Sequence, residues 1–262
     1  MRILITGAGR AIGAATAAEL TTAGHEVVAT ARDVTLLDHV DATLRLPLDV
    51  TDDRSVRRAL EAAGPVDAVV NNAAVSAKGP LESFPLDRLL AMLDTNTVGP
   101  LRLLQHLVPG WRERGSGVVV NISSVQGRVA TPLEGPYSVS KFGLEALSET
   151  LHHELGHFGI RVVVIEPGYI APGMKPTERE LGDPAYGPLW DQWAGTDTKV
   201  TGPGGRPGPG VVAVAVRTAI EDPTTPFRVP VGEDAALVLG ARAAMDDAAF
   251  EAAMRSTLGI TW

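Results

Sequence analysis

Three side chains with the chemistry for proton transfer lie close together near the middle of the chain: Ser124, Tyr137 and Lys141. Because Tyr137 and Lys141 are four residues apart, a helix would place them on the same face, one turn apart. A free phenol has a pKa of about 10, but a neighbouring ammonium favours the phenolate and lowers that pKa. A serine hydroxyl can hold a substrate oxygen against the phenol. The three residues therefore suit the interconversion of an alcohol and a carbonyl.

A surface or packing role is the alternative for this tyrosine–lysine pair. A tyrosine with a lysine four residues later is commonly an exposed pair, or a buried ring beside a lysine that reaches water. The chain has three tyrosines and four lysines, and random placement would give such a pair about one time in twenty. The position of the pair, after a segment that ends in serine, favours the catalytic interpretation.

The segments around these residues are typical of an α/β protein. Residues 117–124, GVVVNISS, begin with an apolar run that predicts a strand buried on both faces. A helix should begin near Pro136, since proline suits the first helical turn. Proteins of this class bind ligands at the carboxyl ends of parallel strands, so Ser123 and Ser124 should reach the same site as the helix.

The first 32 residues predict a nucleotide-binding unit. Residues 2–6 form an apolar strand, the glycine-rich turn GAGRAIG follows, and a helix leads through Gly24 to a second strand at residues 25–32. Strand, glycine-rich turn, helix and strand open a dinucleotide-binding fold. Its glycines let the backbone approach a pyrophosphate, and the helix N-terminus offers free amides.

Together with this unit, Ser124, Tyr137 and Lys141 resemble the active site of the classical short-chain dehydrogenase/reductase family. The glycine turn is similar to the family's TGxxxGxG pattern, with Ala11 in place of the middle glycine, and the later NNAA is similar to its NNAG motif. The resemblance extends over about residues 2–170. It implies an α/β fold, a Rossmann-type doubly wound parallel sheet of about seven strands with helices on both faces.

The resemblance also implies catalytic roles. Tyr137 would exchange the proton of the substrate oxygen, Lys141 would lower the pKa of Tyr137 and hold the nicotinamide ribose, and Ser124 would polarise the carbonyl. Residues 86–114 are predicted to form two helical stretches around residues 94–96, and Asn96 would hold a water that relays protons from Lys141. An asparagine can instead cap or kink the helix.

A coenzyme site follows from the same resemblance. Asp49 and Val50 would flank the adenine, and the turn at Pro167 would lie beside the nicotinamide, although Pro172 replaces the usual threonine there. Asparagines at a strand end can equally stabilise the turn. The implied coenzyme-binding residues are Gly7, Gly9, Arg10, Ile12, Gly13, Arg32, Asp49, Val50, Asn72, Ala73, Tyr137, Lys141, Pro167, Gly168 and Ile170.

The end of the second strand indicates which coenzyme is used. An acidic residue there would bind the ribose 2′-hydroxyl of NAD, whereas an arginine accommodates the 2′-phosphate of NADP. Here Ala31 is followed by Arg32 and Asp33, and Arg10 adds a second cation. Arginine pairs well with phosphate, so the sequence predicts NADP(H). The alternative is that Arg32 and Asp33 form a solvated turn.

Composition excludes some classes of function. The formal net charge of −8 argues against nucleic-acid or anionic-membrane surfaces. The absence of cysteine excludes disulfides and thiol catalysis and fits a cytoplasmic protein without a signal peptide. No apolar run is long enough to span a membrane. His153 and His157 are best assigned to a solvated helix face, so we expect no metal site.

Residues 1–262 are predicted to form a single NAD(P)-binding Rossmann-type domain, with a substrate lid at about residues 171–209. The lid is rich in proline and glycine and carries Trp190 and Trp193, which favour an apolar or cyclic substrate or simply pack the lid against the body. The tail at residues 246–254 should be helical and pack on a neighbouring subunit. The resemblance implies a homo-dimer or homo-tetramer.

The sequence therefore predicts an NADP(H)-dependent oxidoreductase that interconverts a ketone and a secondary alcohol. The partner is a small-molecule carbonyl or alcohol substrate. Two other classes stay open, because the same fold can serve other ends. One is a non-catalytic protein that binds NADP(H) as a sensor or regulator. The other keeps the phenol but performs elimination or epimerisation.

Overall fold

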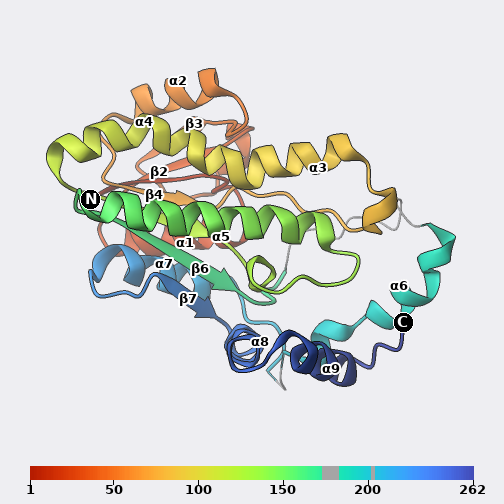
Figure 1. Ribbon diagram of the computed structural model, residues 1–262. Helices are drawn as coiled ribbons and strands as arrows, with labels where there is room; N and C mark the ends of the chain where they lie inside the picture. The colour runs from red at the N-terminus through yellow and green to blue at the C-terminus, as the bar shows by residue number, and fades with distance from the viewer. Residues whose placement is uncertain (173–182, 202–203) are drawn as a thin grey trace.

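Seven parallel strands form the centre of the computed structural model, which describes residues 1–172, 183–201 and 204–262 (Figure 1). The strand order is β3-β2-β1-β4-β5-β6-β7, so the chain reverses its direction of travel between β1 and β4. Such a reversal is the point at which doubly wound sheets bind ligands. The predicted Rossmann-type sheet of about seven strands, with helices on both faces, is confirmed.

The strands and helices have the following bounds. The strands are β1 Arg2–Ile5, β2 Glu26–Ala31, β3 Leu44–Pro47, β4 Ala68–Asn71, β5 Gly117–Ile122, β6 Ile160–Pro167 and β7 Arg228–Val231. The helices are α1 Ala11–Thr22, α2 Asp53–Ala63, α3 Leu86–Leu93, α4 Gly99–Arg114, α5 Gly135–Gly156, α6 Gly187–Trp193, α7 Gly210–Glu221, α8 Glu233–Ala244 and α9 Asp247–Leu258. None of the helices within these described ranges is both long and apolar enough to cross a bilayer.

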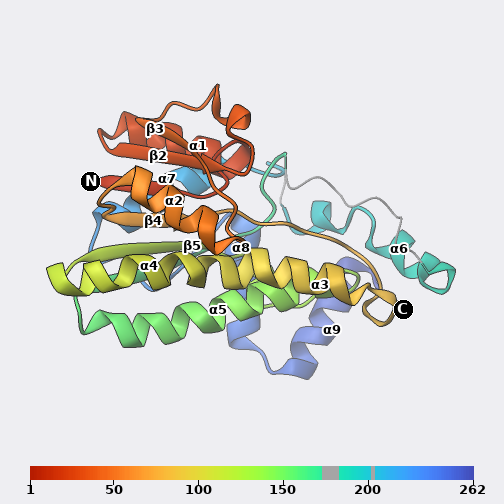
Figure 2. The same cartoon turned by 90° about the horizontal axis from the view of Figure 1, so that it is seen from above.

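Alternate residues of the strands supply two hydrophobic cores, because successive side chains of a strand point to opposite faces. Ile3 and Ile5 pack in one core with residues of α1 and α7, whereas Leu4 packs in the other with residues of α2, α4 and α5. Figure 2 shows α1 and α7 on one side of the strands and α4 and α5 on the other. The apolar runs of the sequence are thus buried on both faces.

The long helical stretch is continuous rather than divided into two helices. A π-helical turn, η3 (Asp94–Val98), joins α3 directly to α4. A π-turn inserts an extra residue into a helix without breaking it and often occurs at functional sites. Asn96 lies within this π-helical turn.

The C-terminal region contains one helix that the sequence analysis did not predict, α8, and the predicted tail helix, α9. Leu258 and Ile260, at the end of the chain, pack with Leu133 and Trp193 of the same chain. In Figure 1 the two helices lie near α6, beyond the end of the sheet. The end of the chain thus packs against its own chain, including Trp193 of the predicted lid.

A chain of buried amides connects the sheet to α5. Asn71 Nδ2 donates to Asn121 Oδ1 at 2.8 Å, and Asn121 Nδ2 donates to Ser148 Oγ at 2.8 Å. Buried polar groups are costly unless they are paired, so these contacts specify how the helix sits on the strands. Asn71 therefore has the stabilising role that its position at a strand end allows.

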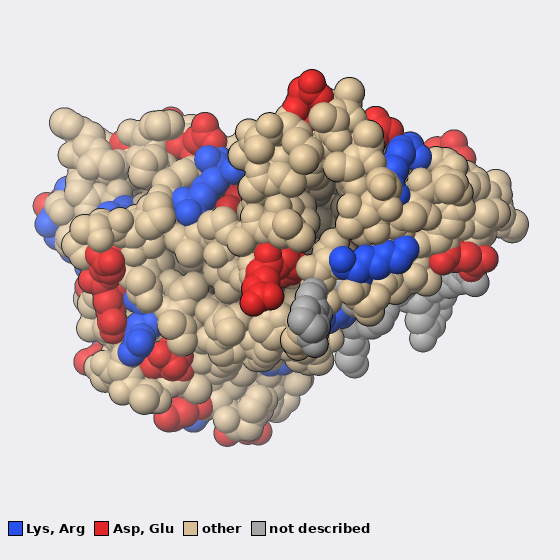
Figure 3. Space-filling view, turned by 90° about the horizontal axis from the view of Figure 1, so that it is seen from below, with Lys and Arg blue, Asp and Glu red and all other residues tan. Residues whose placement is uncertain are grey.

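The surface seen from below carries scattered charges of both signs, without a continuous basic stretch on the coloured part of that face (Figure 3). A nucleic-acid surface needs clustered basic residues. This view agrees with the acidic net charge of −8.

A matched pair of glycines tests the packing of α4 on the sheet. A Cβ at Gly117 would lie 2.5 Å from the buried ring of Trp111, whereas a Cβ at Gly110 would meet nothing within 4 Å. Overpacking costs about 1–3 kcal/mol, so we expect Gly117→Ala to lower the free energy of unfolding by that amount. Gly110→Ala should raise it by about 0.5–1 kcal/mol through helix propensity. Urea unfolding checks both, and equal effects would contradict this packing.

Candidate active site

Ser124, Tyr137 and Lys141 line one cavity of about 920 Å³ at the carboxyl ends of the strands. Ser124 follows β5 in extended backbone, and its Oγ accepts the backbone N–H of Gln126 at 3.2 Å. Pro136 occupies the first turn of α5, which then carries Tyr137 and Lys141 into the cavity wall. The structure thus brings the three predicted residues together.

Burial dominates the chemistry of Tyr137. Its side chain is 9% exposed and packs among Ala77, Phe84 and Met92. Burial raises the pKa of the phenol above its ordinary value, a hydrogen bond with Ser124 opposes this, and the Glu134 carboxylate adds to the rise. Tyr137 is therefore in its protonated form at neutral pH.

The Lys141 ammonium is held by the main chain of the neighbouring strand. Its Nζ donates to the Ile122 carbonyl at 2.8 Å and lies 5.7 Å from the ring centroid of Tyr137. Burial lowers the pKa of Lys141 to about 8, although the Glu145 carboxylate opposes this change. Burial of the phenol is the largest influence on the pKa of Tyr137, and the expected lowering by the Lys141 ammonium stays a prediction.

Asn96 fastens the segment after β4 to α5. Its Oδ1 accepts the N–H of Val75 at 2.8 Å, and its Nδ2 donates to the Val75 carbonyl at 2.8 Å and to Ser140 Oγ at 2.9 Å. Its side chain is buried and does not line the cavity, whereas Thr95 does. These contacts position α5, and the relay role of Asn96 stays a prediction.

The glycine-rich turn provides close backbone approaches. Gly7 has φ of +64°, and a Cβ there would lie 2.9 Å from the Cα of Ala73. A Cβ at Gly13 would overlap the Gly7 carbonyl and come within 2.6 Å of Asn72 Nδ2. Gly13 does not line the cavity, so its role is to let α1 pack on the turn. Gly7, Gly9, Arg10 and Ile12 do line it.

Hydrogen bonds hold this turn against β4. Asn72 Nδ2 donates to the carbonyls of Thr6 and Gly7 at 2.9 and 3.0 Å, and Thr6 Oγ1 accepts the N–H groups of Asn72 and Ala73. Both Asn72 and Ala73 line the cavity. The first turn of α1 has no side-chain cap, so its amide donors are available to an anion.

Two arginines lie beside this anion-binding turn. Arg10 and Arg32 are exposed and line the cavity, and within residues 1–172, 183–201 and 204–262 neither forms a recorded ion pair. Asp33 is engaged in its own turn, where its Oδ1 accepts the N–H of Thr35 at 3.0 Å and the Thr35 hydroxyl at 2.7 Å. These bonds lower the pKa of the Asp33 carboxyl. The site thus presents two guanidinium groups to an anion.

The adenine end of the predicted site is apolar. Leu48 and Val50 line the cavity, whereas Asp49 does not. Asp49 Oδ1 accepts the N–H and the hydroxyl of Thr51 at 2.9 and 2.8 Å, which stabilises the turn before α2. The predicted contact through Val50 is thus accessible, and the contact through Asp49 stays a prediction.

The turn after β6 lines the cavity with Pro167, Gly168 and Ile170. Asp234 on α8 supports this turn, since its Oδ2 accepts the N–H of Tyr169 at 2.6 Å and a Cβ at Gly168 would overlap its carboxylate. Sequence reasoning missed Asp234 because α8 itself was not predicted. Acidic residues before an alanine-rich run were the available signal for the start of that helix.

The far wall of the cavity comes from the lid and the C-terminal helices, and is mostly apolar. Trp193 lines the cavity, while Trp190 packs beside it in a cluster that includes Leu189 and Leu258. Lys78 and Glu134 form an ion pair on the opposite rim. Predicted lid residues 173–182 and 202–203 lie outside the described residues. The other apolar lining residues of this wall are Val200, Leu237, Val238, Ala241, Met245, Phe250, Ala253, Met254 and Leu258.

The same cavity is lined by the glycine-rich turn, with its backbone amides and two arginines, and by Ser124, Tyr137 and Lys141. This combination fits a nicotinamide dinucleotide. In the described ranges no group of three or more His, Cys, Asp or Glu side chains could hold a metal ion.

Comparison with known proteins gives a consistent result. The profile of the family described as short chain dehydrogenase matches residues 1–181. A 3-ketodihydrosphingosine reductase of Bacteroides thetaiotaomicron is 35% identical over 170 residues, which are 63% of this chain and 62% of that protein. The human 17-beta-hydroxysteroid dehydrogenase type 1 is 36% identical over 198 residues, 70% of this chain and 60% of that protein.

Solved structures agree over more of the chain. A short-chain dehydrogenase from Streptomyces avermitilis is 32% identical, with a TM-score of 0.81 over 100% of this chain and 98% of the other. One from Burkholderia cenocepacia, solved in complex with NADP, is 25% identical, with a TM-score of 0.78 over 97% of this chain and 96% of the other.

Ala11 allows a test of strain in the glycine-rich turn. Its φ is +45°, a conformation that costs an alanine about 1 kcal/mol or more. Ala11→Gly should therefore raise the free energy of unfolding by about 1 kcal/mol. The same change at the exposed helical position Ala18 should lower it by about 1 kcal/mol. Urea unfolding measures both, and a destabilised Ala11→Gly protein would refute the strain.

Lys141 allows a test of burial at the catalytic centre. Its pKa is lowered from 10.5 to about 8, so keeping its charge in the folded protein costs on the order of 3 kcal/mol. Lys141→Met should be more stable than the wild type at neutral pH. That advantage should shrink as pH rises from about 8 to 10.5, where the folded lysine is neutral and the unfolded one still charged. Thermal unfolding over this range measures the difference, and a difference independent of pH would rule out the buried charge.

Proposed function

Because this chain belongs to the short-chain dehydrogenase/reductase family, we propose that it is an NADP(H)-dependent oxidoreductase that interconverts a ketone and a secondary alcohol. The observation that carries the proposal is the convergence of Ser124, the buried phenol of Tyr137 and Lys141 on one cavity that also contains a glycine-rich turn. These groups surround the space where a carbonyl oxygen and a nicotinamide can meet.

Each residue has a defined task in this reaction. The coenzyme, when bound, supplies or accepts the hydride. Ser124 donates a hydrogen bond to the carbonyl oxygen, and Tyr137 gives that oxygen its proton. The phenol is protonated at neutral pH, which is the form that donates a proton in the reducing direction. The Lys141 ammonium stabilises the phenolate that remains. Asn96 keeps α5 in place through Ser140.

NADP(H) is the coenzyme that the charges support. Arg10 and Arg32 line the cavity, and the Asp33 carboxylate is bound to Thr35 rather than directed to a ribose. Arginine can pair with a 2′-phosphate through two hydrogen bonds. The similar Burkholderia cenocepacia structure was solved with NADP, which supports the same choice.

An apolar, extended or cyclic substrate suits the far wall. Trp193, Phe250 and Met254 line it together with aliphatic residues of α8 and α9. Such a lining binds apolar surface and leaves a few polar groups to orient the ligand. Relatives named for ketodihydrosphingosine and for hydroxysteroids support a substrate of this kind.

A homo-dimer or homo-tetramer is part of the proposal. Val98, Val139 and Phe142 are 41%, 43% and 43% exposed. Exposed apolar side chains that adjoin one another favour association of chains. Sedimentation analysis would decide the state.

Coenzyme titration tests the function. Purified protein is titrated with NADPH and NADH by tryptophan quenching, and turnover is followed on a panel of ketones. We expect NADPH to bind about tenfold or more tightly than NADH. Arg32→Ala should remove most of that preference, while Arg58→Ala, which removes an exposed charge from α2, should keep it. Tyr137→Phe should bind NADPH yet lose about a hundredfold or more in kcat.

Other outcomes separate the alternatives. Equal or tighter binding of NADH would overturn the NADP(H) assignment but keep the enzyme. NADPH binding without turnover of any ketone would favour a sensor or regulator. A product without net redox change would indicate elimination or epimerisation.

A further inference from the structure

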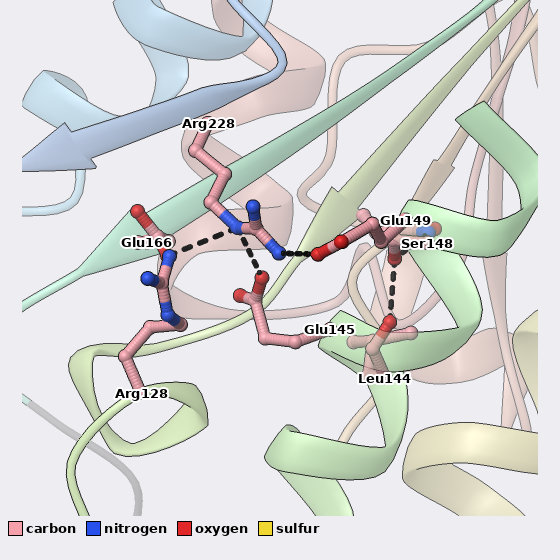
Figure 4. Close-up of polar contacts among 8 residues, drawn as sticks. Arg128, Leu144, Glu145, Ser148, Glu149, Glu166 and Arg228 are labelled. Carbon is pink, nitrogen blue, oxygen red and sulfur yellow. Dashed lines mark hydrogen bonds and ion pairs between the residues drawn. The ribbon is translucent and has the colours of Figure 1, made fainter. Parts of the chain in front are cut away.

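Two buried carboxylates and two arginines connect α5, β6, β7 and the segment after β5: Glu145, Glu166, Arg128 and Arg228, here called the ion cluster (Figure 4). Glu145 and Glu166 have side chains only 5% and 2% exposed. Charged side chains are almost never buried so fully unless they are paired. The pairing within the ion cluster therefore decides whether the cluster is a stable part of the fold.

Arg228 forms short ion pairs with the carboxylates of Glu145 and Glu149 on α5, but only a long one with the carboxylate of Glu166 on β6. Its guanidinium lies 3.0 Å from Glu145 Oε2 and 2.6 Å from the half-exposed Glu149 Oε2, but 3.9 Å from Glu166 Oε1. Arg128 lies 3.5 Å from the same Glu166 oxygen. Among the described residues, Glu166 thus has two long ion pairs, while Glu145 has a direct one.

Three oxygens near this position lack a hydrogen-bond partner among the described residues: Glu145 Oε1, Glu166 Oε1 and Ser123 Oγ. A Cβ at Gly127 would contact both Ser123 and Glu145, so these two side chains surround one small region. Burial and the neighbouring Glu145 carboxylate raise the pKa of Glu166 to about 7, although the two arginines oppose this. Glu166 can therefore take up a proton near neutral pH.

Three residues of the ion cluster are close in the chain to residues that line the cavity. Glu145 lies one helical turn after Lys141, Arg128 lies four residues after Ser124, and Glu166 directly precedes the Pro167–Gly168 turn. The other charged groups near this turn are Asp234 of α8, bound to the N–H of Tyr169, and Lys141, bound to the Ile122 carbonyl. His153 of α5 lies near Glu149.

The charge balance depends on Glu166. With Glu166 ionised, Glu145, Glu149 and Glu166 give three negative charges against the two arginines. With Glu166 protonated, two carboxylates face two arginines. Like charges in a buried region repel strongly because screening by solvent is weak. Ionisation should therefore push the end of β6 away from α5.

We propose that Glu166 is a positioning residue whose proton holds the Pro167–Gly168 turn in register with α5, and that loss of this proton weakens coenzyme binding and slows hydride transfer. The part of the inference that concerns hydride transfer rests on the proposed function. Glu166 acts through the turn that it precedes, since it does not itself line the cavity.

The test is the pH dependence of NADPH affinity, measured by tryptophan quenching from about pH 6 to about pH 8.5. We expect the wild-type Kd to rise at least about threefold over this range. Glu166→Gln, which mimics the protonated side chain, should show a clearly smaller rise, because Lys141, whose pKa is about 8, still titrates in this range. Glu149→Gln is the matched control, since it removes a half-exposed carboxylate from the same Arg228. It should retain the wild-type dependence.

Turnover adds a second readout. On a ketone substrate, kcat/KM of the wild type should fall over the same pH range, and that of Glu166→Gln should fall less, because Lys141 alone then titrates near the site. If no ketone is turned over, the proposed function fails, while the NADPH affinities still decide the role of Glu166. A Glu166→Gln protein with the wild-type pH dependence, or a Glu149→Gln protein without it, would overturn the inference.

A measurement on the wild type alone tests the inference even if the Glu166→Gln variant does not fold. Infrared difference spectra between about pH 6 and about pH 8.5 should contain the carbonyl band of one protonated carboxyl that disappears as pH rises, because exposed carboxyls ionise below this range. Absence of that band would also overturn the inference.

Discussion

The hydrogen bond from Lys141 to the Ile122 carbonyl is the contact on which the site depends. It joins α5 to the end of β5, so the helix that carries Tyr137 and the segment that carries Ser124 keep a fixed relation. A buried ammonium needs such an acceptor, because an unpaired buried charge is very costly. A shift of α5 along the sheet would lose this bond and separate the phenol from Ser124.

The same helix is attached to the sheet by polar groups as well as apolar ones. Its buried face includes Ser140, Lys141, Glu145 and Ser148 beside Leu144. Polar contacts are directional, so they specify one position of the helix where apolar packing alone would tolerate several. This explains why the amide chain, Asn96 and the ion cluster all converge on α5. Precision at the catalytic trio follows from many satisfied contacts behind it.

At the other end of the cavity, the lack of a side chain at the glycines matters most. Gly13 is not part of the lining, yet without it α1 could not approach the Gly7 carbonyl. The position of α1 decides where its free amides point, and hence where a phosphate can bind. Ala11 adopts positive φ in the same turn, which indicates that the required backbone path is kept even where glycine is replaced.

The sequence alone determined the features that depend on near neighbours: the buried strands, the glycine-rich turn, and the spacing of Tyr137 and Lys141 on one helix face. These follow from local periodicity and backbone preference, and the structure has them. Tertiary structure decided the rest. The raised pKa of Tyr137 follows from its burial, and it packs with Ala77, Phe84 and Met92, which come from distant segments. The partners of Asn96, the continuous π-turn, and Asp234 on α8 likewise depend on contacts between segments far apart in the chain. Burial and long-range pairing are properties of the folded molecule, so no local pattern encodes them.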